Sequence, residues 1–128
     1  MKYLLDTHTL IWLINGDIKL SKKALETIEL STARVVVSVV SFWEIAIKVS
    51  LGKLELTLPF SEIINKVNDS GFGIMGITFD HTLQLSQLPF HHRDPFDRTL
   101  IAQTLSEDLV IISKEKLFDE YNVKRIWD

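Results

Sequence analysis

The chain has 128 residues, of which 46% are hydrophobic and none is cysteine, and its formal net charge is −3. This composition argues against intrinsic disorder and excludes disulfides and thiolate metal sites, and the length fits one domain, residues 1–128, with a sizeable core. No apolar run reaches membrane-spanning length and no cleavage site follows the apolar start, so we expect a cytoplasmic protein without membrane contact.

The apolar pattern predicts strands and helices that alternate along the whole chain. In chain order we expect a strand over 2–5, helices over 9–14 and 22–30, a strand over 34–39, a helix over 41–50, an extended piece over 54–58, a helix over 60–70, a strand over 74–78, helices over 80–87 and 94–106, a strand over 109–113, a short helix over 116–121 and a strand over 123–127. Such alternation predicts an α/β fold in three layers, with a central parallel sheet.

Acidic residues follow several of these strands at the same relative place. They are Asp6 after the first strand, Glu44 just past the second, Asp94 and Asp97 at the start of a later helix, and Glu115 after the fourth strand. The carboxyl ends of parallel strands gather on one edge of the sheet, where ligands bind. Carboxylates gathered there repel one another unless a cation joins them, and hard oxygen ligands suit Mg²⁺ or Mn²⁺. The pattern predicts a small metal-dependent enzyme that acts on phosphate esters.

Each acid also has a structural interpretation, which the sequence leaves open. Asp6 is a good N-cap for the helix that follows it. Ser41 and Glu44 have the spacing of a capping box, in which Glu44 would reach back to the start of its helix. Asp94 before Pro95 is a natural N-cap, so the simplest division is that Asp94 caps the helix and Asp97 acts in the site. Glu115 fits an ordinary solvated helix entry.

The remaining polar and aromatic residues give weaker signals. The four histidines lack the spacing of a zinc site, and a structural role in a loop is expected for His91 and His92. Ser113 ends a strand and could orient a carboxylate or a water. The aromatic residues Trp12, Phe42 and Trp43 are expected in the core. No GxSxG, phosphate-binding-loop or dinucleotide-binding pattern occurs, which argues against a serine hydrolase, an NTPase or a dehydrogenase.

Segments spread over nearly the whole chain carry a family resemblance. They are Leu4–His8, Ser41–Lys48 with Gly52–Leu54, His92–Arg98 with Leu100–Gln103, and Ile112–Glu115 continuing through Tyr121 and Val123. In this order they resemble a PIN-domain ribonuclease, and specifically a VapC-type toxin of a bacterial toxin–antitoxin pair. The resemblance implies a three-layer α/β/α PIN-like domain.

The resemblance also implies roles for the acids. Asp6, Glu44 and Asp97 match the metal-binding and catalytic acids of the family, with Asp94 as the alternative to Asp97. The fourth acid of the family is usually the aspartate of a Thr-x-Asp pattern, where this chain has Ser113-Lys114-Glu115. Glutamate is one methylene longer, so Glu115 is expected to be catalytic either directly or through a water.

The implied reaction is hydrolysis of an RNA phosphodiester with Mg²⁺ or Mn²⁺ as cofactor. Basic residues near the acids are expected to contact RNA phosphates; they are Lys48, Arg93, Arg98 and Lys114. The net charge does not suggest a nucleic-acid-binding domain, but the carboxylate cluster accounts for much of it. The implied partners are the RNA substrate, a small antitoxin that neutralises the toxin, and a second copy of the chain in a homodimer.

Two other functions compete with this interpretation. Asp6, Asp80 and Lys114 loosely imitate the acid, acceptor and lysine of a phospho-receiver domain, although that function leaves Glu44 and Asp97 unexplained. A catalytically degenerate PIN-fold module that only binds RNA or protein is the second alternative, since Glu115 departs from the family pattern.

Overall fold

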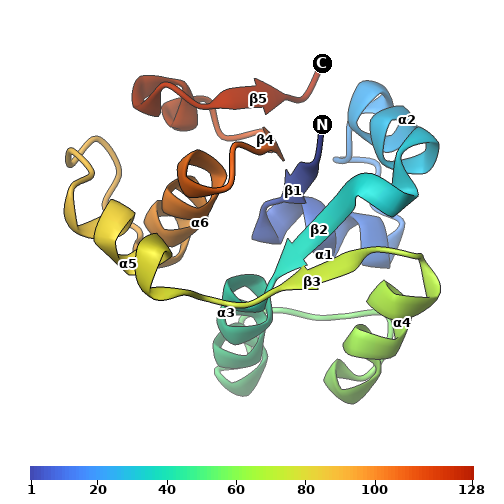
Figure 1. Ribbon diagram of the computed structural model, residues 1–128. Helices are drawn as coiled ribbons and strands as arrows, with labels where there is room; N and C mark the ends of the chain where they lie inside the picture. Colours follow the sequence, from blue (N-terminus) through green and yellow to red (C-terminus); the bar gives the residue numbers. More distant parts are fainter.

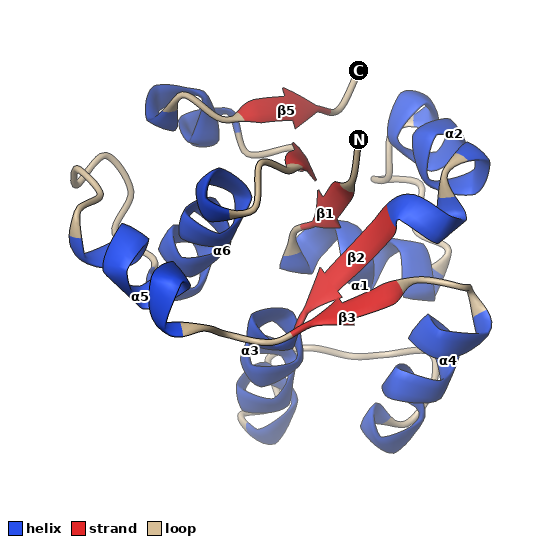
Figure 2. Ribbon diagram, in the orientation of Figure 1, coloured by secondary structure: helices blue, strands red, loops and turns tan.

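A computed structural model describes all 128 residues and shows a five-stranded parallel sheet with helices on both faces (Figure 1; Figure 2). The strands are β1 (Tyr3–Leu5), β2 (Val35–Ser38), β3 (Gly73–Met75), β4 (Val110–Ile112) and β5 (Lys124–Ile126). The α-helices are α1 (Thr7–Asn15), α2 (Lys22–Leu30), α3 (Val39–Ser50), α4 (Ile63–Asp69), α5 (Phe79–Ser86) and α6 (Pro95–Ser106). Short 3₁₀ helices are η1 (Thr32–Arg34), η2 (Phe60–Glu62) and η3 (Lys116–Tyr121). The expected α/β fold with a central parallel sheet is confirmed.

Alternation along the short strands divides the core into two halves. Leu5 and Ile112 face one cluster, which α1, α2 and α4 complete, while Leu4 and Ile111 face the other, which α6 and η3 complete. Successive strand residues point to opposite faces, so two apolar neighbours in one strand serve both layers. Figure 1 shows the same division, with α5 and α6 on one side of the sheet and α1, α2 and α4 on the other.

The strand order places β1 in the middle of the sheet. The order is β3-β2-β1-β4-β5, and every neighbouring pair is parallel. From β1 the chain builds outward through β2 and β3, and then it returns to add β4 and β5 on the other side. The carboxyl ends of β1 and β4 therefore flank the point where the strand order reverses, which is where ligands bind in open α/β sheets.

Most expected elements are present, with boundaries that differ by one or two residues, except that the strand expected over 74–78 ends three residues earlier, at Met75. The largest functional consequence is at α3, which begins at Val39 and not at Ser41, because the Ser38 hydroxyl accepts a hydrogen bond from the Val40 N–H at 3.1 Å and caps the helix. The helix expected over 60–70 is divided into η2 and α4. The extended piece over 54–58 does not join the sheet.

None of the helices combines the length and the apolar character needed to cross a membrane.

Candidate active site

Asp6 lies at the centre of the carboxyl edge of the sheet. Its side chain is 3% exposed and caps α1 by accepting a hydrogen bond from the Thr9 N–H at 2.9 Å. The Ser113 hydroxyl, at the end of the neighbouring strand β4, donates to the other carboxylate oxygen at 2.5 Å. Burial raises the pKa of Asp6, while the hydrogen bonds from Ser113 and Thr9 partly oppose that increase. Asp6 is therefore both a cap and a buried carboxylate, and Ser113 orients it as the sequence suggested.

Glu44 lies inside α3 and is only 2% exposed. One carboxylate oxygen accepts a hydrogen bond from the Lys48 ammonium at 2.7 Å, and the other is buried without a hydrogen-bond partner. The capping-box interpretation of Ser41 and Glu44 is wrong, because α3 starts earlier and the Ser41 hydroxyl instead accepts from Thr7. A buried carboxylate oxygen without a partner is costly, so this atom is available to a water or a cation.

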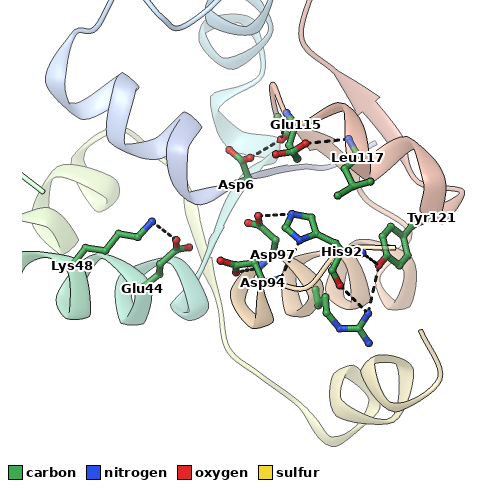
Figure 3. Close-up of polar contacts among 11 residues, drawn as sticks. Asp6, Glu44, Lys48, His92, Asp94, Asp97, Glu115, Leu117 and Tyr121 are labelled. Carbon is green, nitrogen blue, oxygen red and sulfur yellow. Dashed lines mark hydrogen bonds and ion pairs between the residues drawn. The ribbon is translucent and has the colours of Figure 1, made fainter. Parts of the chain in front are cut away.

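Asp94 caps α6 as the sequence suggested, which leaves the Asp97 carboxylate free of that role. Asp94 is the N-cap of α6 and accepts a hydrogen bond from the Asp97 N–H at 2.9 Å. Asp97 lies in the first turn, with its side chain 16% exposed and directed toward the space between Asp6 and Glu44 (Figure 3).

His92 has the structural role in a loop that the sequence suggested, but its contact with Asp97 was not foreseen. Its Nδ1 accepts a hydrogen bond from the Asp94 N–H at 3.1 Å, and its Nε2 lies 3.0 Å from an Asp97 carboxylate oxygen (Figure 3). The two atoms are close without the alignment of a good hydrogen bond. The sequence signal was the position of His92 two residues before a helix cap, which places the ring over the helix start.

The acids are close enough to change one another's ionisation. The pKa of Asp97 is raised from 3.8 to about 8, first by burial and then by the negative charges of Asp94, Asp6, Glu44 and Glu115. The pKa of this one carboxyl group is thus raised by acids that come from separate parts of the chain. The structure brings together all the acids that the sequence selected.

Glu115 belongs to the cluster by its charge but differs in its contacts. It is exposed, and its carboxylate caps η3 by accepting a hydrogen bond from the Leu117 N–H at 3.2 Å. The interpretation of Glu115 as a helix entry is therefore confirmed as one of its roles.

The four basic residues expected at the substrate differ sharply in accessibility. Arg93 and Lys114 are exposed, and Lys48 is paired with Glu44. Arg98 contradicts the prediction: it is 6% exposed, and its guanidinium donates to the carbonyl groups of Leu88 and Pro89. A buried guanidinium that is occupied by backbone acceptors cannot bind a phosphate, so Arg98 has a structural role.

The donor set suits a divalent cation, although its side chains are not in a coordinating arrangement. Asp6, Glu44 and Asp97 offer carboxylate oxygens, which Mg²⁺ and Mn²⁺ prefer, and one Glu44 oxygen lacks any partner. No group of three acidic or histidine side chains converges closely enough to hold an ion as it stands. Lys48 and His92 contact two of the three carboxylates, so binding requires these side chains to turn.

The PIN domain family matches residues 3–124 of the chain. The chain belongs to the PIN domain family. Among curated proteins, no sequence match was found.

Solved structures share the PIN-domain fold at low sequence identity. The crystal structure of VapBC2 from Rickettsia felis, bound to a DNA fragment from its promoter, aligns with a TM-score of 0.74 and 16% identity over 100% of both chains. DNA-bound VapBC from Salmonella typhimurium aligns at 0.72 and 18% identity, over 98% of this chain and 97% of that one. VapBC-5 from Mycobacterium tuberculosis, a member of the VapBC family of toxin–antitoxin systems, aligns at 0.59 and 17% identity, over 99% and 98%.

Proposed function

We propose that this PIN-domain protein is a VapC-type toxin, a Mg²⁺- or Mn²⁺-dependent endoribonuclease that a small cognate antitoxin neutralises. Support comes from the acidic cluster at the carboxyl edge of the sheet, from membership of the PIN domain family, and from the fold shared with VapBC complexes.

One observation carries the proposal, namely that the buried carboxylates of Asp6 and Glu44 lie with Asp97 at one edge of the sheet, and that one Glu44 oxygen has no hydrogen-bond partner (Figure 3). Burial and the negative charges of acids from distant parts of the chain raise the pKa of Asp97 to about 8, which agrees with this gathering. A fold that only needed helix caps would gain nothing from bringing these carboxylates together, because their repulsion opposes folding. Strongly perturbed acids in one cluster are typical of a functional site, and a divalent cation would offset the repulsion.

The proposed roles follow from the position of each acid. Asp6 and Asp97 would hold the cation, since Asp6 is buried at the strand-order reversal and Asp97 is partly buried and directed toward it (Figure 3). Glu44 would bind the cation or its water with the oxygen that lacks a partner. When bound, the cation activates a water and offsets the charge that develops on the phosphate. Ser113 keeps Asp6 oriented, and Glu115 would act through a water at the rim.

A cavity beside Asp6 offers a path for the phosphates of the substrate. It measures about 650 Å³, and its lining includes the basic side chains of Lys114, Lys116 and Arg125 next to Asp6 and Glu115. Cationic groups along such a path position a nucleic-acid strand without reading its bases. We therefore assign Lys114, which is exposed in this cavity, to phosphate contacts, and we assign the exposed Arg93 to a phosphate outside it.

The phospho-receiver alternative does not fit the structure. Such a site needs the acceptor aspartate on a strand next to the one that carries Asp6. Asp80 follows β3, which is an edge strand, and β2 separates it from β1. The catalytically degenerate module remains the competing proposal, because Glu115 is exposed and caps η3.

Cleavage of RNA by the purified protein tests the proposal. We expect cleavage with Mg²⁺ or Mn²⁺, no cleavage with EDTA, and no cleavage by Asp6→Asn, which keeps the size of the side chain and its ability to cap α1. Asp80→Asn is the matched control and should cleave like the wild type. Equal activity of Asp6→Asn and the wild type would exclude the assignment, whereas weak Mn²⁺ binding without cleavage would favour the degenerate module.

A further inference from the structure

A second cavity, separate from the one beside Asp6, is formed by residues next in sequence to the acids. It measures about 660 Å³, and its walls include Trp43 and Phe96. Trp43 directly precedes Glu44, and Phe96 directly precedes Asp97, so the cavity walls and the acids share the same turns of α3 and α6. Consecutive Cα atoms are about 3.8 Å apart, so the backbone that carries Glu44 and Asp97 also borders this cavity.

Aromatic rings are unusually accessible in this cavity. The sequence-based expectation that Trp43 lies in the core is wrong: it is 58% exposed, and Phe90, at another wall, is 82% exposed. Trp43 meets the edge of Phe96 at 5.0 Å between ring centroids and 86° between planes. This T-shaped contact holds the indole in place while more than half of the residue stays open to solvent. Large exposed aromatic rings that are held rigidly are typical of binding surfaces.

The charge of the cavity is opposite to that of the molecule. Its lining contains Arg93 and Arg98 and no acidic residue, although the whole chain carries a net charge of −3. Arg93 is exposed, and the buried Arg98 guanidinium lies 4.0 Å from the centroid of Phe90 and is held by uncharged oxygen acceptors. Arg98 is thus occupied inside the protein, and the exposed Arg93 is the cation of this cavity that can meet a phosphate. A cavity with rigid aromatic rings and uncompensated positive charge complements a base attached to a phosphate.

We propose that this cavity binds an unpaired nucleobase of the RNA substrate, which stacks on Trp43 while Arg93 contacts an adjoining phosphate. The inference rests on the proposed nuclease function and deepens it: the substrate is single-stranded at a nucleotide flanking the scissile bond. Stacking on an aromatic ring tolerates any base, because every base has a π face. The cavity thus selects unpaired RNA over duplex RNA, in which bases are already stacked and paired.

Charge and position favour RNA over a protein occupant. An apolar segment of a second copy or of another protein would gain from the aromatic rings but would leave Arg93 without a partner. A polyanion satisfies both, and its scissile phosphate must in any case lie at the adjacent acids. A second copy seated on this surface is therefore treated as an outcome of the test.

The test measures the affinity of short single-stranded RNA for Asp6→Asn protein, with and without Trp43→Ala. Fluorescence anisotropy gives the dissociation constant without any need for cleavage, and wild-type cleavage is measured separately. We expect Trp43→Ala to weaken binding roughly 5- to 100-fold, as for the loss of one stacked base, and Trp43→Phe to retain most of the affinity. An RNA that lacks the stacked base should bind the parent Asp6→Asn protein more weakly by a similar factor. The same RNA should bind the Trp43→Ala variant no more weakly than the intact RNA does.

Phe79→Ala is the matched control, since Phe79 is an aromatic residue that is 77% exposed and does not line the cavity. It should bind RNA like the parent. Equal affinity of the parent and Trp43→Ala would overturn the inference even if the wild type cleaves RNA. The inference is also overturned if light scattering shows that Trp43→Ala separates a dimer while the affinity of each protomer for RNA is unchanged. Weakened binding in Trp43→Ala without wild-type cleavage would support the subsite and reject the nuclease.

Discussion

At the scale of single residues, Asp97 links the site to stability. Its pKa is about 8 in the folded protein, against about 3.9 for an unperturbed aspartate in the unfolded chain. Between these values the folded state holds a proton that the unfolded state releases, so this group destabilises the fold increasingly as the pH rises from about 4 to about 8. Above that range the cost stays constant.

Asp97→Asn removes this cost and should raise the melting temperature of the metal-free protein. The gain should be small at pH 5 and larger at pH 8, and each kcal/mol of relieved cost corresponds to roughly 3–6 °C for a chain of this size. Thermal denaturation of both proteins at the two pH values measures the difference. The same gain at both pH values would show that Asp97 ionises normally in the folded state.

Asp6→Asn should separate metal binding from folding. We expect it to keep the cap of α1, to melt at or above the wild-type temperature without metal, and to lose most of the stabilisation by Mn²⁺. For a ligand at 100 times its dissociation constant that stabilisation is about 2.7 kcal/mol. Thermal melts over a Mn²⁺ titration give the result without reference to activity. An undiminished shift in the variant would place the cation elsewhere.

Asp94 and Asp97 should differ in what their loss costs. Asp94→Ala removes the N-cap of α6 and should destabilise the protein by about 1 kcal/mol, while Asp94→Asn keeps an acceptor and should cost little. Asp97→Asn should reduce cleavage far more than Asp94→Asn. Chemical denaturation and cleavage rates of the variants check both statements, and the reverse order would mean that ligand and cap have been exchanged.

At the scale of elements, Arg98 organises the connection between α5 and α6. Its guanidinium donates to the carbonyl groups of Leu88 and Pro89, which precede α6. Arg98→Met keeps much of the volume but leaves these acceptors without a donor, so we expect a loss of roughly 1–3 kcal/mol. Arg93→Met is the control and should change stability by less than about 0.5 kcal/mol, because Arg93 is exposed. Urea denaturation compares the two, and equal stability would reject the structural role of Arg98.

Elements dominated by local chemistry were predictable from the sequence. Apolar β-branched runs predicted the strands. Asp94 before Pro95 predicted the start of α6, because capping depends on neighbouring residues. The start of α3 was not predictable in the same way, since Ser38 and Ser41 are both acceptable caps and tertiary packing selects between them.

The gathering of the acids at one edge was predictable in part, because Asp6, Glu44 and Glu115 each come shortly after a strand, whereas the surroundings of the acids were not. Arg93 and Arg98 look equivalent along the chain, and only the carbonyl groups of another segment draw Arg98 inside. The exposure of Trp43 depends on what the facing helix leaves uncovered. Contacts between distant segments leave no local pattern, so these features needed the structure.

At the scale of the whole molecule, we expect a homodimer that a small antitoxin holds inactive. If the antitoxin sends an arginine toward the carboxylates, the arginine competes with the cation for the same oxygens. Inhibition should then weaken as Mg²⁺ or Mn²⁺ rises. Cleavage assays at increasing metal with the co-expressed partner test this, and light scattering gives the oligomeric state. Inhibition that is independent of metal would mean that the antitoxin covers the site without entering it.

The hydrogen bond between Asp6 and Ser113 joins positions 107 residues apart and sits where β1 pairs with β4. The central strand β1 therefore gains its second neighbour, β4, only from a segment late in the chain. During synthesis, Asp6 and Glu44 emerge well before Asp97 and the partner strand β4. A chain ended after residue 108 has Asp6, Glu44 and Asp97 but lacks β4 and Ser113, so we expect it to fail both to fold and to cleave RNA.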